Sequence, residues 1–514
     1  MNNSATKDIL ELEVANFGPI VEGMIDLRPL TVFVGPSNTG KSYLAIMIYA
    51  LHRYLSNGSW TDRRRFSRNP LTFRGAGVQK LSKKITNEFI ELAGEIAALK
   101  GRPQYEEGTV LPSSVVDVIR SRFSEQGGYL GNEIGRCFGI EEVGALIRKG
   151  TKGPSRIVFR RHNANELTPI DHLLTISAHT SEFKTIIPES TQMRIGAGGD
   201  DYQPEHLRQM AMEMIEAFDR DEERSNYYSW RLLDALTAHV LPQIVGPLYL
   251  PAFYLPADRT GVMHAHNVVV SALIESAAMT GLRPAARTPM LSGVLADFLE
   301  ELIGLDLKPY RRRKRRHNLD TQLEKDILGG SIGVGKSEAI GYPYFTYRPE
   351  GWKDSLSLMN ASSMVSELAP VVLYLRYMVG SGNVLIVEEP ESHLHPAMQV
   401  EFTRQLAALV KKGIRVIVTT HSEWVLEELA NIVRRFELST RNRKSTTGAK
   451  IALHPDQVGA WLFKQKKRPK GSVVEEITMD DETGLYPTDY DVVSEELYNE
   501  SVNIFSRTQQ GNAK

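Results

Sequence analysis

The sequence predicts an α/β fold, a sheet with flanking helices that is interrupted by a large, mostly helical insertion. Three observations predict it. A short apolar strand, a glycine-rich loop and a long helix follow one another at residues 30–56. Two more apolar strands, each ending in polar residues, lie at 384–387 and 414–421. Most of the chain separates the first region from the other two, and a compact sheet domain does not need that separation.

The composition is that of a large globular protein. The chain has 514 residues, 42% of them hydrophobic, which suits roughly two or three structural units. Its 61 basic and 62 acidic residues leave a net charge of −1, so no global field attracts polyanions, although local patches remain. The single cysteine, Cys137, excludes an internal disulfide and a multi-cysteine metal site. The N-terminus lacks a signal-peptide layout, and no apolar run approaches the ~20 residues that span a bilayer. We therefore expect a cytoplasmic protein without a membrane partner.

The motif G-x-x-x-x-G-K-S occurs near the N-terminus, in the stretch VGPSNTGKSYLAIM. Such a phosphate loop turns tightly over glycines, points backbone N–H groups at phosphates and leads into a helix whose positive dipole end faces the anion. The context is right, because the β-branched run LTVFV precedes it and a helical pattern without Gly or Pro follows it up to Gly58. The predicted nucleotide-binding residues are Gly35, Pro36, Ser37, Asn38, Thr39, Gly40, Lys41 and Ser42.

The same motif recurs at Gly330–Ser337, in GGSIGVGKSEAIGYP. Only SEAI separates its lysine from Gly341 and Pro343, and a helix does not run through that spacing, because proline lacks the donor N–H and clashes with the preceding turn. The aromatic, alternating YPYFTYRP that follows predicts a strand. We therefore predict a glycine-rich β-turn here, and one nucleotide site per chain, at Lys41.

A pair of glutamates follows the apolar strand in NVLIVEEPESHLHP. Hydrolysis of a nucleoside triphosphate needs a carboxylate on the magnesium shell and a group that orients the attacking water. Glu388 stands at the end of the strand, where it can reach the magnesium ion. Glu389 follows it and is predicted to polarise the water.

Two further groups complete the predicted site. The strand IRVIVTT ends at His421, whose imidazole can sense or stabilise a γ-phosphate. Ser362 and Ser363 precede a helix with an apolar stripe, and serines at a helix N-terminus offer hydroxyls and a dipole to an anion. Taken alone, the histidine is a structural residue and the serines are an ordinary helix cap. Their order along the chain with the other motifs favours the functional interpretation.

Together these motifs resemble an ABC-type ATPase head of the OLD/RecF/SMC-like group. The phosphate loop, the two serines, EEPESHLHP and TTHS occur in the order typical of that group. The opening LELEVANFGPIVEGMIDLRPL also resembles its N-terminal strands, and YLPADRTG, at Tyr254–Gly261, recurs in its stand-alone, defence-type members. The resemblance covers residues 1–56 and 340–470 well and the middle of the chain poorly.

The resemblance implies that the chain binds and hydrolyses ATP with Mg2+. The β- and γ-phosphates would lie at Lys41 and the magnesium ion at Ser42 and Glu388, with Glu389 as the catalytic carboxylate and His421 as the switch. The group usually has aspartate where Glu388 stands. The longer side chain still coordinates the ion, and it predicts slow turnover.

Such heads hydrolyse ATP as head-to-tail sandwich dimers, so the resemblance also implies an assembly. Ser362, with Ser363 beside it, would reach the γ-phosphate bound by a second copy, and PESHLHP would lie at the interface. That placement is favoured over a metal pair formed by His393 and His395. The group usually has glycine where Met364 stands, and glycine permits close approach to phosphate, so the contact to the second copy is expected to be weaker here. We expect a homodimer or a higher homo-oligomer joined through the heads.

The predicted organisation has six segments. They are 1–56 and 340–470 as the two parts of the ATPase head, 57–245 as a helical insertion, 246–260 as a return to the head, 261–339 as a helical segment with a basic loop, and 471–514 as a C-terminal tail. The insertion is expected to be compact, because sustained heptads are missing and Pro and Gly interrupt it often.

One charge run stands out, the stretch YRRRKRRH. Its six basic residues are Arg311, Arg312, Arg313, Lys314, Arg315 and Arg316. The run is either a contact to the phosphate backbone of DNA or RNA, or a solvated loop or a surface that pairs with an acidic partner. DRRRF, at Asp62–Phe66, is a weaker candidate for the same contact.

These features predict an ATPase that senses a signal or regulates a separate effector, a nuclease or a toxin, in anti-phage defence. The chain itself is not expected to be a nuclease, because the residues after His421 lack a glycine-flanked glutamate followed by Asp-x-Asp. Two alternatives remain open. One is an SMC/RecF-like ATPase of DNA repair or chromosomes that binds nucleic acid directly, and the other is a scaffold that uses ATP as a structural ligand.

Overall fold

The structure is a computed structural model that describes most of the chain. The described residues are 9–56, 83–98, 109–124, 127–162, 169–189, 191–195, 204–218, 222–265, 291–305, 318–336, 343–441, 451–480, 484–485 and 495–505. The basic residues predicted as contacts at 311–316 and 62–66 lie outside them, as does Ser337 of the second loop motif. The chain divides into two compact units. Unit 1 comprises Met1–Gly18, Ile46–Phe253 and Met290–Val294, and unit 2 comprises Pro19–Ala45, Tyr254–Pro289 and Leu295–Lys514.

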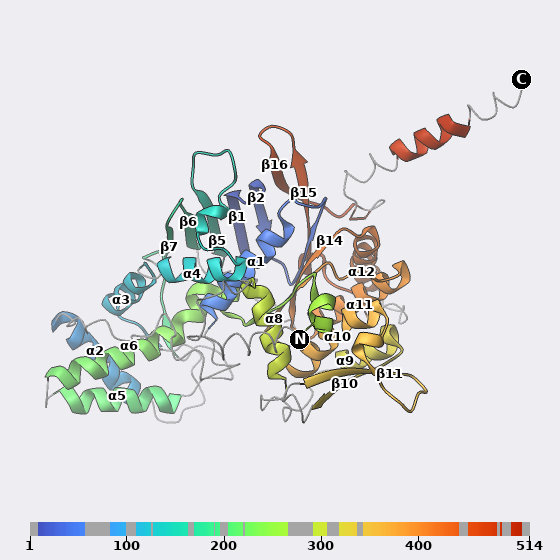
Figure 1. Ribbon diagram of the computed structural model, residues 1–514. Coiled ribbons are helices and arrows are strands. Elements are labelled where there is room, and N and C mark those ends of the chain that lie inside the picture. Colours follow the sequence, from blue (N-terminus) through green and yellow to red (C-terminus); the bar gives the residue numbers. More distant parts are fainter. Residues whose placement is uncertain are drawn as a thin grey trace, which may run out of the picture. The chain divides into compact units, whose positions relative to one another are not determined.

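Unit 2 is built on a mixed sheet with the strand order β2, β16, β15, β3, β14, β13 (Figure 1). The strands are β2 (Ile20–Asp26), β16 (Gly471–Glu476), β15 (Val458–Lys466), β3 (Leu30–Val34), β14 (Arg415–Thr420) and β13 (Val384–Glu388). The four strands β15, β3, β14 and β13 run parallel. Every residue of β3 and β13 is buried, which explains their continuous apolar runs. The carboxyl ends of the four strands therefore share one edge of the sheet.

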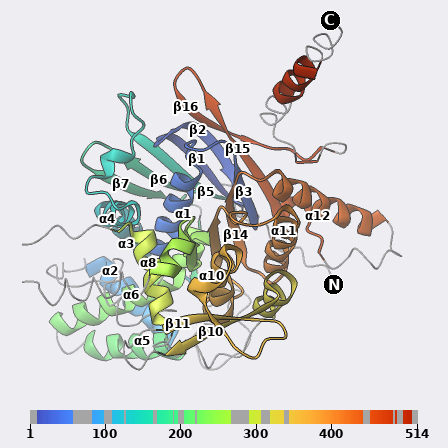
Figure 2. The same ribbon diagram turned by 45° about the vertical axis from the view of Figure 1, so that its right-hand side comes forward.

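Helices pack beside this sheet. They include α10 (Ser363–Tyr377), α11 (Pro396–Lys411), α12 (Glu423–Arg441) and α9 (Leu319–Leu323), which continues as the π-helical turn η5 (Glu324–Leu328); α1 (Lys41–Leu55) and α8 (Gly293–Gly304) begin or end in this unit. Helices α11 and α12 lie side by side in both views (Figures 1 and 2). The short helical turns are η6 (Leu358–Asn360) and η7 (Pro455–Gln457).

The second loop motif forms a strand. Residues Gly330–Lys336 make β10, which pairs antiparallel with β11 (Pro343–Pro349), and β12 (Leu356–Ser357) completes a three-stranded sheet. The predicted strand at YPYFTYRP is confirmed, and the predicted β-turn at 330–337 is wrong. Its glycines suit a strand because aromatic rings lie over them: a Cβ on Gly335 would lie 2.2 Å from the ring of Tyr344.

Unit 1 contains the antiparallel strand order β7, β6, β5, β1. These strands are β1 (Ile9–Phe17), β5 (Ser155–His162), β6 (Ile170–Ile176) and β7 (Ser181–Ile186), and a small pair joins β4 (Thr109–Val110) to β8 (Arg194–Ile195). Its helices are α2 (Lys83–Ala98), α3 (Ser113–Ser124), α4 (Gly127–Phe138), α5 (Pro204–Phe218) and α6 (Glu222–Val245), with the turns η2 (Val143–Leu146) and η3 (Gly246–Tyr249) before β9 (Ala252–Leu255). Among the described helices, none has the length and apolarity that crossing a bilayer would require.

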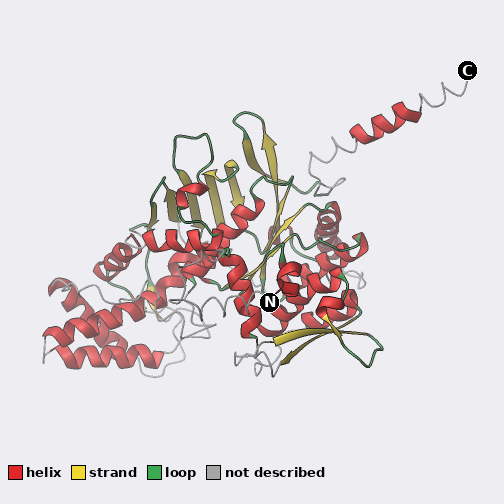
Figure 3. Cartoon of the chain, viewed as in Figure 1, coloured by secondary structure: helices red, strands yellow, loops and turns green. Residues whose placement is uncertain are grey.

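The predicted mostly helical insertion at 57–245 therefore needs a correction. Among its described residues it contains the helices α2 to α6, but it also contains β5, β6 and β7, which Figure 3 shows as yellow arrows beside the red helices. The sequence held a partial signal, because three of the four alternate residues Ile170, His172, Leu174 and Ile176, which are buried in β6, are apolar. The predicted tail also begins too early, since residue 471 starts β16, which pairs with β15.

Candidate functional site

The phosphate loop joins β3 to α1, as the sequence predicts. Gly35 has φ +137° and Gly40 has φ +103°, two backbone conformations that residues other than glycine rarely adopt. A Cβ on Gly35 would lie 2.6 Å from the carbonyl oxygen of Phe463, and one on Gly40 would lie 2.7 Å from Ile20. The loop is thus wedged between neighbouring backbone and side chains, and both glycines are required for it to turn here.

The loop folds around its own lysine. The Lys41 ammonium donates hydrogen bonds to the carbonyl oxygens of Gly35, at 2.8 Å, and Pro36, at 2.9 Å. Burial lowers the pKa of Lys41 to about 8, and the carboxylates of Glu389, Glu391 and Glu388 oppose that effect. Because an ammonium has three donors, one remains for a phosphate oxygen.

Glu388 ends β13 and is 7% exposed. Its carboxylate accepts a hydrogen bond from the N–H of Ala257, at 3.3 Å, and one from the hydroxyl of Ser42. Burial raises the pKa of Glu388, and these hydrogen bonds oppose the rise. A carboxylate beside a serine hydroxyl is the hard oxygen pair that Mg2+ prefers. The structure thus brings the two predicted magnesium ligands together.

Glu389 and His421 also meet. The Nε2 atom of His421 lies 3.6 Å from Oε1 of Glu389, and this contact lowers the pKa of Glu389. Glu389 has φ +42°, an uncommon conformation for a side chain, and its N–H donates to the carbonyl of Thr419, at 2.9 Å. The paired register of Glu388 with Thr419 explains why residues so far apart in sequence meet at the sheet edge.

Glu391 belongs to the same cluster, although the sequence did not single it out. One carboxylate oxygen accepts the backbone N–H of His421, at 2.6 Å. Burial raises the pKa of Glu391, and the hydrogen bonds that it accepts from His421 and Thr420 oppose the rise. Glu391 therefore holds the backbone of His421 at the end of β14. Its position two residues after the acidic pair Glu388–Glu389 was the available sequence signal.

Ser362 and Ser363 lie apart from this cluster within one chain. Ser362 is the N-cap of α10, its hydroxyl accepting the N–H of Val365 at 3.4 Å, and Ser363 is the first residue of the helix. Both side chains are exposed. Within the described part of the chain, no hydrogen bond or ion pair joins either serine to Lys41 or to the acidic residues.

One of the two histidines of PESHLHP caps a helix. His395 is the N-cap of α11, and its Nδ1 accepts the N–H of Ala397 at 3.3 Å. His393 is exposed and has φ +61°. The stretch YLPADRTG, which was predicted to lie partly in the head, also contributes here, although none of its residues was predicted as a site residue: Ala257, Arg259 and Thr260 follow β9 and contact the end of β13 or α10. An apolar strand that ends in charged residues was the signal for it.

Comparisons with known proteins agree with a nucleotide-binding domain. Residues 312–426 match the family model described as AAA ATPase domain, a stretch that contains Ser362, Glu388, Glu389 and His421 but not the phosphate loop. No curated protein matches the chain.

Three solved structures show a distant likeness. They are the SmcHead bound to the C-winged helix domain of ScpA (11% identity, 92% of this chain and 98% of that chain, TM-score 0.41), the Smc head domain with an extended coiled coil bound to the C-terminal domain of ScpA from Pyrococcus furiosus (12%, 95% and 99%, 0.37) and the SMC head domain from Thermotoga maritima (11%, 92% and 100%, 0.34). At these values the likeness says nothing about function. The chain is an α/β protein, and the match over residues 312–426 together with the strand, loop and helix at residues 30–55 supports a nucleotide-binding domain.

Proposed function

We propose that this chain is a magnesium-dependent ATPase that dimerises through its nucleotide-binding unit and regulates a separate effector. One observation carries the proposal. Lys41 and Ser42 of the phosphate loop converge with Glu388, Glu389 and His421 at the carboxyl edge of neighbouring parallel strands.

Each group of this cluster has a task in hydrolysis. Lys41 neutralises the β- and γ-phosphates, while the loop's N–H groups hold the triphosphate in place. Ser42 and Glu388 would hold a magnesium ion, which, when bound, would offset the charge that develops on the phosphates. Glu389 accepts a proton from the attacking water, and its lowered pKa keeps it ionised for that task. His421 orients Glu389 and contacts the γ-phosphate.

The exposed serines support a dimer. Ser362 and Ser363 present hydroxyls and the N-terminus of the 15-residue helix α10 to solvent, where they suit an anion. Since no hydrogen bond joins these described serines to Lys41 in their own chain, we infer that a second copy supplies the phosphates that they bind. If the dimer forms only with ATP, an effector that binds the dimer and not the monomer responds to ATP. We propose that this effector is a nuclease or a toxin of anti-phage defence.

A second candidate function is direct binding of nucleic acid by the same ATPase. The hairpin of β15 and β16 carries five cations, namely Lys464 and Lys466 at the end of β15 and Lys467, Arg468 and Lys470 in the turn. Two of them lie near carboxylates, Lys464 at 3.9 Å from Glu475 and Lys466 at 3.6 Å from Glu22. The hairpin is tied to the phosphate loop, because the hydroxyl of Ser472 donates to the carbonyl of Thr39. A DNA affinity that falls with salt and with K467E/R468E substitution would favour this function.

The test of the proposal measures ATP binding, hydrolysis and native mass in three proteins. We expect the wild type to bind and hydrolyse ATP, Lys41→Ala to lose binding, and Lys336→Ala, which changes the lysine of the second motif on β10, to behave as wild type. The native mass should double with ATP in the wild type and not in Lys41→Ala. Tight binding without turnover would support the scaffold alternative, and equal loss in both lysine variants would contradict the single site.

A further inference from the structure

Arg259 is the largest side chain of the described residues that is fully buried, with 0% exposure. Its guanidinium donates to the carbonyl oxygens of Glu388, at 2.6 Å, and Glu389, at 3.2 Å. It also donates to the carbonyls of Pro256, at 2.9 Å, and Glu367, at 3.2 Å, and forms an ion pair with the carboxylate of Glu367. One side chain thus touches the end of β13 and the first turns of α10.

A buried cation persists only where its donors are satisfied, so these contacts are a requirement of the fold. They are also specific to arginine. The planar fork of five N–H donors reaches four carbonyls and a carboxylate at once, whereas a lysine ammonium has three donors at one point. Burial lowers the pKa of Arg259, and the charge of Glu367 opposes that effect most.

The contact with Glu389 lies where the backbone is unusual. Glu389 has φ +42°, and this conformation turns its carbonyl toward Arg259 while the side chain reaches His421. The left-handed backbone conformation costs a residue other than glycine about 1 kcal/mol or more of free energy. It therefore persists only where the surrounding structure holds it. The guanidinium binds the carbonyls of the two peptide groups that flank the Cα of Glu389, and it is therefore placed to hold the left-handed conformation of this residue.

The segment after β9 also contacts the N-terminal turns of α10, where Ser362 and Ser363 lie. The hydroxyl of Thr260 donates to the carboxylate of Glu367. Nε2 of His264 lies 2.9 Å from the hydroxyl of Ser366, whose N–H bonds to the carbonyl of Ser362. The segment after β9 thus joins the N-terminal turn of α10 to the acidic end of β13.

We propose that Arg259 is a positioning residue for ATP hydrolysis, which holds Glu389 in its left-handed conformation and couples it to the serine-bearing end of α10. The inference rests on the proposed ATPase function. It assigns to Arg259 a role that acts through Glu389, since the guanidinium is enclosed by protein groups and is not placed to touch the nucleotide.

The test compares Arg259→Lys with Arg376→Gln as a matched control. Arg376 also lies on a buried contact of α10, where it pairs with Asp320 and Glu324, but it does not touch the end of β13. We expect Arg259→Lys to lower kcat about tenfold to a hundredfold while the ATP Kd changes less than about threefold. The number of ATP molecules bound per chain should stay at the wild-type value, and Arg376→Gln should keep the wild-type kcat.

A second variant separates coupling from stability. Glu367→Gln removes the charge of the α10 partner but leaves the carbonyls of Glu388 and Glu389 to Arg259, so we expect a smaller loss of kcat and a weaker ATP-dependent dimer. A wild-type kcat in Arg259→Lys would overturn the proposal. So would a parallel loss of bound ATP and turnover in Arg259→Lys and Glu367→Gln, or an equal loss of kcat in Arg376→Gln, because each marks a purely structural role. A wild type that binds ATP without hydrolysing it would instead refute the proposed ATPase.

Discussion

The Nε2 atom of His421 lies 3.6 Å from Oε1 of Glu389, although 31 other residues separate the two in the chain. The parallel pairing of β13 with β14 makes the contact, because Glu388 is in register with Thr419 and each strand delivers its next polar residues to the same edge. Glu391 then holds the backbone of His421 in place. The contact is the geometric basis for treating the two residues as one functional pair.

Replacing Glu389 with glutamine should separate ATP binding from hydrolysis. Glutamine keeps the shape of the side chain but cannot accept a proton from water, so we expect ATP binding near the wild-type level and turnover slower by about 100-fold or more. Single-turnover hydrolysis and native mass with ATP measure both, and the ATP-bound dimer should accumulate. Glu423→Gln, an exposed change on the first turn of α12, is the control. Wild-type turnover in Glu389→Gln would remove this residue from the catalytic role.

An alanine at Gly35 should disrupt the phosphate loop. The residue has φ +137°, and its new Cβ would lie 2.6 Å from a backbone oxygen of Phe463, which cannot swing aside. We expect strain of about 1–3 kcal/mol and an ATP affinity lower by about tenfold or more. Calorimetric titration with ATP measures the affinity.

The control for that change is Gly351→Ala. Gly351 also has a positive φ, +80°, but a Cβ there would meet nothing within 4 Å. The control should therefore cost about 1 kcal/mol of stability and leave the affinity for ATP unchanged. Equal affinities in the two variants would show that crowding at Gly35 does not shape the loop.

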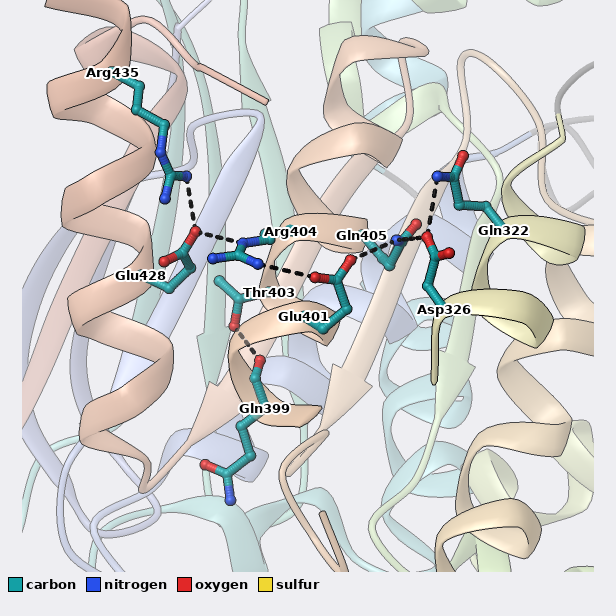
Figure 4. A network of polar contacts seen from close by, with 9 residues as sticks. All are labelled: Gln322, Asp326, Gln399, Glu401, Thr403, Arg404, Gln405, Glu428 and Arg435. Atoms are coloured by element: carbon teal, nitrogen blue, oxygen red, sulfur yellow. Dashed lines mark hydrogen bonds and ion pairs between the residues drawn. The ribbon is translucent and has the colours of Figure 1, made fainter. Parts of the chain in front are cut away.

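Removing the charge of Glu428 should destabilise unit 2. Figure 4 shows Glu428 of α12 between Arg435 and Arg404, which also bonds to Glu401 on α11. Glu428 is 4% exposed and receives hydrogen bonds of 2.9 and 2.8 Å from the two arginines. We expect Glu428→Gln to lower the free energy of unfolding by about 1–3 kcal/mol, as measured by urea denaturation.

The matched change for Glu428→Gln is Asp117→Asn in unit 1. Asp117 pairs with Arg120 at 2.7 Å, but its side chain is 65% exposed. Because exposed pairs contribute little, we expect a change of about 0.5 kcal/mol or less. A similar loss of stability in both variants would contradict the importance of burial in the helix–helix network.

Acid should destabilise unit 1 through His172. Its ring is fully buried, with Nδ1 3.0 Å from the hydroxyl of Thr185 and Nε2 3.2 Å from the carbonyl of Ile244, and burial lowers its pKa from 6.5 to about 4. The folded state thus binds fewer protons than the unfolded state between these values. The contribution of neutral His172 is complete above pH 6.5 and is lost as the pH falls toward 4, by about 3 kcal/mol in all.

A variant that cannot titrate tests this pH dependence. In His172→Gln, we expect the loss of stability between pH 7 and pH 4.5 to shrink by about 2–3 kcal/mol relative to wild type, measured by urea denaturation at both pH values. His179→Gln is the control, because the side chain of His179 is 79% exposed. An unchanged pH dependence in His172→Gln would show that other groups dominate the acid response.

The local features of the phosphate loop could be predicted from the sequence. The strand at Leu30–Val34 and the helix from Lys41 match the structure, since a buried parallel strand is a continuous apolar run and a helix needs an uninterrupted apolar period. The strands before Glu388 and His421 were predicted for the same reason. The roles of these residues in hydrolysis remain predictions.

The alternation of apolar and polar residues that marks a strand was harder to recognise where long loops and glycines interrupt it. The strands β5 to β7 fall in a stretch that was predicted to be mostly helical, and the glycines of β10 imitate a turn. Tyr344 and Tyr347 decide the second case, because their rings fill the space over Gly335 and Gly330 that a turn would leave open. These rings belong to the paired strand β11. The seven residues of β10 alone therefore give no sign that their glycines are covered.

What the sequence by itself determined, then, is that the strands before the phosphate loop, Glu388 and His421 are buried and that these polar groups stand at their ends, because both follow from local apolar patterns and loop chemistry. The tertiary structure alone decided which of these residues meet. Three contacts join segments that are distant in the chain. They are the hydrogen bond between Glu391 and the N–H of His421, the contact of His421 with Glu389, and the hydrogen bonds of Arg259 to the carbonyls of Glu388 and Glu389. Strand register and burial set these contacts, and neither can be read from any one segment alone.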